Sequence, residues 1–245
     1  MASAVEHSTR IVGLDVFRGW AIAMMIVFHL TYDLAWFGFV DIDVTREPFW
    51  VYFRYVIVTI FTVGVGISLG IVHTPRIRWD RVRRRAAILG GAALVVTIAT
   101  YIQSPGAWVY FGILHFIWMA SLVGLVFLKR PWWALLGAVV ILYGSYAGWL
   151  WEAQHRFYLW IAPLLHLPRY TEDLARFFPW FGAVLMGIAG YEWGWHRVIF
   201  SHPFFAARNP LNNALAFMGR HALVIYLIHL PVLYGVVWGY RLWSV

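Results

Sequence analysis

The chain has 245 residues, of which 62% are hydrophobic and only 12% are charged, whereas about a quarter of the residues in soluble domains are charged. This composition excludes an ordinary soluble enzyme, because one aqueous core cannot hide so much apolar surface. The net charge of +8 lies in short segments between apolar stretches, so it indicates membrane topology rather than nucleic-acid binding. The absence of Cys excludes disulfides, thiolate metal sites and a cysteine acyl-enzyme.

A membrane-spanning helix needs about 20 mostly apolar residues, and seven segments meet that condition. We therefore predict an all-α, polytopic bundle of about seven transmembrane helices. The predicted spans are residues 19–39, 49–72, 86–102, 108–128, 132–151, 178–195 and 214–240. An eighth apolar segment, 157–167, is short and contains Pro163, so we interpret it as re-entrant or interfacial. If it spans instead, the bundle has eight helices.

The segment after the second predicted span, TPRIRWDRVRRR, is rich in arginine. Because Lys and Arg accumulate in cytoplasmic loops, we predict that this segment and the amino end are cytoplasmic and that the carboxyl end is outside. The start of the chain, MASAVEHSTRIVGLDVFRGW, has no small-residue cleavage site before its apolar stretch. We therefore expect the first helix to stay as an anchor.

The stretch GLDVFRGWAIAMMIVFHLTYDL, which leads into the first predicted span, contains four ionisable residues, Asp15, Arg18, His29 and Asp33. Ionisable residues are costly inside a bilayer and therefore indicate function. Helical spacing of ~100° and ~1.5 Å per residue places Arg18 and His29 on one face, about 16 Å apart, with Asp33 one turn beyond His29. A His oriented by a carboxylate can take a proton from an acceptor or carry an acyl group.

This stripe also has a purely structural interpretation. His29 and Asp33 can satisfy each other or polar groups of neighbouring helices, and Arg18 with Asp15 can be an ordinary ion pair at the inner end of a span. Both interpretations stay open on the residues alone.

Three further polar residues lie inside predicted spans. His115 is expected near the membrane depth of His29. It is either a second acid or base, or a core histidine whose ring nitrogens form hydrogen bonds with its neighbours. Arg54 lies near the outer end of its span, where it can balance Asp33, hold an anionic acceptor or snorkel to the interface. His229 lies near the middle of the last span, as a third member of the site. No span has two histidines on one face, so we predict neither a metal nor a haem.

The first span, LDVFRGWAIAMMIVFH, resembles the opening helix of membrane-embedded acyltransferases, in which an Arg followed by ten residues and a His recurs. More of the chain is similar, in the same order, to bacterial and archaeal relatives of the heparan-alpha-glucosaminide N-acetyltransferase catalytic domain. The similar segments are FTVGVGISLGI, RVRRRAAILG, YFGILHFI, FFPWFGAVLMGIAGY and ALAFMGRHALVIYLIH.

The resemblance implies one transmembrane acyltransferase domain over residues 1–245, multi-pass in the cytoplasmic membrane of a bacterium or archaeon. It implies transfer of an acyl group, acetyl foremost, from cytoplasmic acyl-CoA to an extracytoplasmic glycan or lipid-linked acceptor. The expected partners are thus acyl-CoA, the acceptor and membrane lipids, and no nucleic acid. Acceptor identity, acyl chain length and assembly as a homo-oligomer stay open.

The resemblance also implies roles for individual residues. His29 is the expected catalytic base or acyl carrier, oriented by Asp33. In the animal lysosomal members an Asn stands at the position of His29 and the reactive His lies further along, where this chain has Val40, so His115 is a rival catalytic residue. The residues expected to bind coenzyme A phosphates are Arg18, Arg84, Arg85 and Arg220, and those expected to bind the acceptor are Arg54, Tyr32 and His229.

Two alternatives belong to other functional classes. Buried His and Asp also make proton relays, so a small transporter or flippase is the leading alternative. A non-catalytic membrane subunit is the third, and it would tolerate His29→Ala without loss of activity in its pathway.

Overall fold

The computed structural model describes residues 11–171 and 173–244. Helices dominate these residues, and the only β-type pairing among them is an isolated bridge between Phe111 and Leu174. The chain divides into two compact units, one made of residues up to 57 and from 196 onward, the other of residues 58–195. The all-α fold of a membrane helix bundle is confirmed, whereas the single functional domain stays a prediction.

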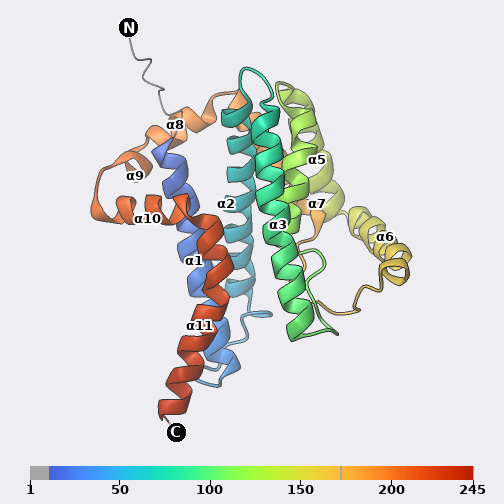
Figure 1. The fold of residues 1–245 in the computed structure, drawn as a ribbon. Helices are drawn as coiled ribbons and strands as arrows, with labels where there is room; N and C mark the ends of the chain where they lie inside the picture. The colour runs from blue at the N-terminus through green and yellow to red at the C-terminus, as the bar shows by residue number, and fades with distance from the viewer. Residues whose placement is uncertain (1–10, 172, 245) are drawn as a thin grey trace. The chain divides into compact units, whose positions relative to one another are not determined.

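Figure 1 shows the helices in chain order. Their bounds are α1 (Val12–Trp36), α2 (Pro48–His73), α3 (Trp79–Gln103), α4 (Ile113–Val123), the 3-10 helix η1 (Gly124–Phe127), α5 (Pro131–Tyr146), α6 (Trp149–Leu165), α7 (Phe177–Glu192), α8 (Trp195–Ser201), α9 (Pro203–Ala206), α10 (Pro210–Arg220) and α11 (Ala222–Ser244). The longer connections lie between α1 and α2, between α3 and α4 and between α6 and α7.

In the first unit, α1 packs against α10 and α11 (Figure 1). The contact with α10 is so close that two positions admit only glycine. A Cβ on Gly19 would collide with the backbone of Leu215, and a Cβ on Gly219 would collide with the carbonyl of Asp15. Small residues at such crossings bring helix backbones into direct contact, as is common inside membranes. The position of α1 is therefore fixed by backbone contact.

In the second unit, the main core lies between α2, α4, α5 and α7, and α3 packs against α4. Its largest fully buried side chain is Phe116. Gly66 of α2 and Gly187 of α7 repeat the close approach of the first unit, because a Cβ on either would meet backbone of the other helix. These contacts hold α2 and α7 together without long side chains between them.

Four described helices are long and apolar enough to cross a membrane, namely α1, α2, α3 and α11, and the bent pair α5–α6 would be a fifth span. The number of seven spans stays a prediction. The direction of insertion also stays a prediction, and residues 1–10 lie outside the described part. The predicted span 108–128 is helical only over 113–127. The carboxylate of Asp173 accepts a hydrogen bond from the Ile113 amide at 3.2 Å, where this helix begins.

Two predicted boundaries were wrong. The span predicted for 132–151 ends at Tyr146, and the chain bends by 81° into α6, through Gly148 at φ +89°. The span predicted for 214–240 is two helices that meet at His221, whose backbone is not helical. Arg220 and His221 stand at this second break, but the apolar residues on both sides extended the predicted span across it.

Candidate functional site

The ionisable stripe predicted on the first helix lies on one unbroken helix, α1. Near its start, Arg18 Nη1 lies 4.0 Å from the carboxylate of Asp15, which is buried. His29 is half-buried and Asp33, one turn later, is buried. The structure therefore places a basic group near the beginning of α1 and an imidazole with a carboxylate near its end.

His29 faces a second imidazole, that of His229 on α11. Their ring centroids are 4.9 Å apart and the rings are inclined at 64°. The side chain of Phe28 contacts His29 as well, edge to face at 5.4 Å. Sequence reasoning placed both histidines near the middle of their spans but did not pair them, since the relative rotation of two helices is not encoded in either helix alone. The pair is the centre of the candidate site.

A hydrogen bond within α11 determines the proton distribution of His229. Its Nδ1 lies 2.6 Å from the carbonyl oxygen of Tyr226. A carbonyl oxygen can only accept, so Nδ1 carries the hydrogen and donates it. The neutral ring then has a bare lone pair on Nε2, and this nitrogen is buried without a hydrogen-bond partner among the described residues.

Asp33 has an unsatisfied atom of the same kind. Its Oδ2 is buried and has no hydrogen-bond partner in the described ranges. Within those ranges no hydrogen bond joins Asp33 to His29, so the orienting role of Asp33 stays a prediction. Buried polar atoms without partners are rare and expensive in folded proteins. A hydrogen-bond donor on a substrate or a water molecule could satisfy each of the two acceptors, Asp33 Oδ2 and His229 Nε2.

A pocket lies at the end of α1, directly beyond these residues. This cavity of about 280 Å³ is open to its surroundings rather than enclosed, since Tyr32 and Trp36 in its lining are exposed. Aromatic and acidic side chains line it together, including Tyr32, Trp36, Asp41 and Asp43. The Tyr32 and Trp36 rings are nearly parallel at 12°, with centroids 6.4 Å apart. We call this cavity the Tyr32 pocket.

Asp43 gives the Tyr32 pocket a fixed negative charge. The hydroxyl of Thr45 donates to Asp43 Oδ1 at 2.6 Å, and the Thr45 amide donates to the same oxygen at 3.0 Å. These hydrogen bonds lower the pKa of the Asp43 carboxyl below its usual range, the bond from the Thr45 hydroxyl most of all. The carboxylate is thus ionised at neutral pH. Arg46 Nε lies 3.8 Å from its Oδ2, so a cationic or hydrogen-donating ligand would share this carboxylate with Arg46.

Besides His229, two residues are predicted to bind the acceptor, Tyr32 and Arg54, and they lie in different environments. Tyr32 lines the pocket. Arg54 is exposed, with its guanidinium carbon 6.0 Å from the Tyr55 ring centroid. No hydrogen bond or ion pair joins Arg54 to Asp33 in the described part of the chain, so a charge balance between these two residues has no geometric support here.

His115 lies in the second unit and has both ring nitrogens engaged. The amide of Gly112 donates to Nδ1 at 3.2 Å, so Nε2 carries the hydrogen and donates to the Thr97 hydroxyl at 3.0 Å. Thr97 in turn donates to the carbonyl of Val109 at 2.9 Å. This chain of bonds joins α3 to the start of α4. His115 stays a candidate, but its bonds are those expected of a structural histidine.

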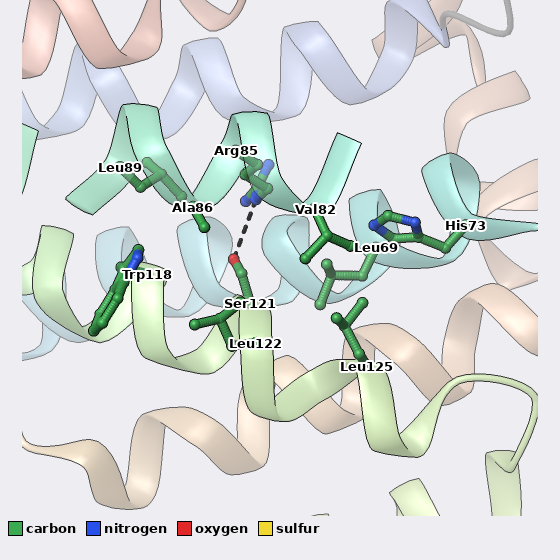
Figure 2. A pocket seen from close by; sticks show the side chains of 10 residues that line it. All are labelled: Leu69, His73, Val82, Arg85, Ala86, Leu89, Trp118, Ser121, Leu122 and Leu125. Atoms are coloured by element: carbon green, nitrogen blue, oxygen red, sulfur yellow. Dashed lines mark hydrogen bonds between the residues drawn. The ribbon is translucent and has the colours of Figure 1, made fainter. Parts of the chain in front are cut away.

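Two of the arginines predicted to bind coenzyme A, Arg84 and Arg220, are exposed. Arg85 lines a pocket between α2, α3 and α4, where its Nε donates to the Ser121 hydroxyl at 3.2 Å (Figure 2). The cavity is about 10 Å³, enough for about one water molecule and too small for a pantetheine arm. Exposed arginines on α3 therefore offer coenzyme A a surface rather than a preformed cleft.

No group of three or more metal-ligating side chains is present among residues 11–171 and 173–244. His29 and His229 thus have no third ligand in the described structure.

Comparison with known proteins gives one match. The family model described as heparan-alpha-glucosaminide N-acetyltransferase, catalytic, matches residues 10–231. That range includes His29, Asp33, His115 and His229. No curated protein and no solved structure matches the chain.

Proposed function

Because the chain belongs to the heparan-alpha-glucosaminide N-acetyltransferase catalytic family, we propose that it moves an acetyl group from cytoplasmic acetyl-CoA to an acceptor across the membrane. The family and the apolar helices identify the chain as a multi-pass membrane acetyltransferase. The donor, the acceptor and the role of each histidine are the content of the proposal. The membrane is that of a bacterium or archaeon, with the arginine-rich 76–85 segment on the cytoplasmic side.

The observation that carries this proposal is the contact between the half-buried His29 and the buried His229, on the stretch of α1 that precedes the Tyr32 pocket. His29 acts on the acetyl group, either as the base toward the acceptor or as a nucleophile that carries the acetyl group. Asp33, one turn away, orients the imidazole of His29 and stabilises its protonated form. Tyr32 lies three residues after His29, so the pocket opens about 5 Å further along the helix axis. Neither imidazole lines the pocket, so an acceptor bound there must extend back along α1 for its reactive group to reach them.

The donor lies along α1. Arg18 is about 16 Å from His29 along the helix axis, so an extended donor can have its phosphates at the inner end and its thioester at the histidines. Further candidates for binding the phosphates are Arg84, Arg85 and Arg220, since one guanidinium group can donate two parallel hydrogen bonds to a phosphate group. Other acyl-CoA molecules share this shape, so the acetyl preference rests on the family.

The acceptor is a glycan, free or lipid-linked. Stacked aromatic rings such as Tyr32 and Trp36 offer flat apolar faces to a sugar ring, and the ionised Asp43 attracts an amine or hydroxyl donor. An amino sugar has both features, which favours transfer to nitrogen over transfer to oxygen. Arg54 serves an acceptor that carries a further anionic group.

Arg18→Ala tests the donor assignment. Loss of one charge-assisted hydrogen bond costs about 1.5–3 kcal/mol, so we expect the KM for acetyl-CoA to rise at least about tenfold, with a smaller change in kcat. Arg156→Ala is the matched control, because Arg156 is also an arginine paired with a carboxylate on its own helix, that of Glu152. Equal KM values for wild type and Arg18→Ala would contradict the assignment.

One alternative function has a specific observation in its favour. The unpartnered buried atoms of Asp33 and His229 would also suit a proton relay in a transporter. Purified protein in vesicles distinguishes the two functions: we expect release of free coenzyme A thiol that depends on an added amino sugar. A proton-driven solute flux without thioester consumption would contradict the acetyltransferase proposal.

A further inference from the structure

We propose that His229 is a second catalytic residue: its Nε2 is the base that takes the proton from the acceptor as the acceptor attacks the acetyl carbon. This inference rests on the proposed function and sharpens it. It replaces the role in acceptor binding that the sequence suggested for His229, and it divides the chemistry between the two imidazoles.

The first argument is the tautomer. The 2.6 Å bond from His229 Nδ1 to the Tyr226 carbonyl commits the hydrogen of the neutral ring to Nδ1, because the partner can only accept. Nε2 is then a bare lone pair, which is the form that a general base requires. For His29 no hydrogen bond is present within the described residues to select one tautomer. The fold therefore determines which nitrogen of His229 accepts a proton, whereas either nitrogen of His29 can be the bare one.

The second argument is the location of that lone pair. His229 is 4% exposed, and Nε2 has no hydrogen-bond partner among the described residues. A purely structural histidine has both nitrogens satisfied, as His115 has through Gly112 and Thr97. An unsatisfied nitrogen at this depth costs stability, and a donor group arriving with a substrate recovers that cost. The 4.9 Å contact with His29 places this nitrogen's ring at the centre of the site.

The chemistry balances in either route of the proposed function. The acceptor nitrogen or oxygen forms a bond to the acetyl carbon and loses one proton to His229 Nε2. In direct transfer the carbon–sulfur bond breaks, and His229 passes the proton to the coenzyme A thiolate. If His29 carries the acetyl group, its nitrogen first bonds to the acetyl carbon, the carbon–sulfur bond breaks, and the His29 N–H proton goes to the coenzyme A thiolate. The acceptor then displaces the His29 nitrogen, which receives the acceptor's proton from His229. No oxidant, reductant or metal is needed.

Few charged groups surround the proposed base. The helices that pack against α11 in this unit are α1 and α10. Their titratable side chains in the described structure are Asp15, Arg18, His29, Tyr32, Asp33 and Arg220. His29 is the member of this set that has a ring contact with His229. On α11 itself the Tyr226 ring also contacts the ring of His229, with 5.5 Å between the centroids.

His229→Asn separates the catalytic role from a structural one. The Asn side-chain amide nitrogen occupies nearly the place of Nδ1 and can still donate to the Tyr226 carbonyl, whereas nothing replaces Nε2. We expect kcat to fall by at least about 100-fold, the low end for loss of a general base, with an unchanged KM for acetyl-CoA and an unchanged melting temperature. His221→Asn is the matched control, since His221 Nδ1 also contacts a carbonyl on its own helical stretch, that of Phe217, at 2.9 Å, but is exposed.

The pH profile gives the second readout. A base must be unprotonated, so wild-type kcat/KM is expected to rise with pH through the ionisation of His229, and the residual activity of His229→Asn should lack that rise. Wild-type activity in His229→Asn, with the rise retained, would overturn the inference and leave the proposed function standing. If wild-type protein itself transfers no acetyl group from acetyl-CoA, the proposed function fails instead, whatever the variant does.

Discussion

Acetyl transfer by His29→Ala should fall by about 100-fold to 10,000-fold, the range for loss of a positioned acid, base or nucleophile. The reason is geometric: His29 is the imidazole of α1 that faces His229 at 4.9 Å, directly before the Tyr32 pocket. Either role proposed for His29, base or acetyl carrier, requires a ring nitrogen that Ala lacks. The measurement is kcat for acetyl transfer by purified protein, with acetyl-CoA binding measured in parallel.

His155→Ala is the matched control for His29→Ala, because His155 is exposed and its ring stacks on Tyr158 rather than on a second histidine. We expect it to transfer at the wild-type rate. The effects of substituting residues that act as one unit are not additive. The double variant His29→Ala, His229→Asn should therefore lose no more activity than the less active of the two single variants. Full activity of His29→Ala in a folded protein would contradict the role of His29, and a matching loss in His115→Ala would move it to His115.

Gly19→Ala should destabilise the protein by about 3 kcal/mol or more, at the upper end of the cost of overpacking. The added Cβ would collide with the carbonyl oxygen, carbonyl carbon and Cα of Leu215. These are backbone atoms of α10, so no side-chain rotation relieves the collision and the two helices must separate. For a chain of this size the melting temperature in detergent should drop by about 6–12 °C.

Gly235→Ala is the matched control for Gly19→Ala, since it is a helical glycine of the same unit with no atom within 4 Å of its added Cβ. Replacing an unhindered helical glycine by alanine stabilises a helix by about 0.5–1 kcal/mol, so its melting temperature should be unchanged or slightly higher. Equal melting temperatures for Gly19→Ala and wild type would show that α1 and α10 are not in backbone contact.

The helices most predictable from sequence were those whose apolar residues run between clear polar ends. Residues 49–72 became α2, nearly residue for residue, because Pro48 and the arginine-rich segment delimit it. The errors arose where one residue changes the backbone direction inside an apolar run. Gly148 adopts a left-handed conformation and turns the chain by 81°, and a hydropathy window averages over such a residue.

The pairing in the candidate site was not predictable from the sequence, and the membrane depth assigned to its residues stays a prediction. Counting along each span put His29 and His229 in the middle of their helices, and counting also put His115 there. Only the structure distinguishes them, because hydrogen bonds to Gly112 and Thr97 engage His115, whereas His229 Nε2 has no partner among the described residues. The Tyr32 pocket was out of reach of sequence reasoning, since it depends on how the 40–45 segment folds back over the end of α1.

The sidedness of transfer tests the central claim most directly. Vesicles whose arginine-rich 76–85 segment faces outward, verified by protease access, would be loaded with an impermeant amino sugar and supplied externally with acetyl-CoA labelled in its acetyl group. We predict labelled acetyl amino sugar inside the vesicles and free coenzyme A outside, with neither formed by His29→Ala. Coenzyme A release without a labelled product inside, or labelling that persists at the wild-type rate in His29→Ala, would contradict the account.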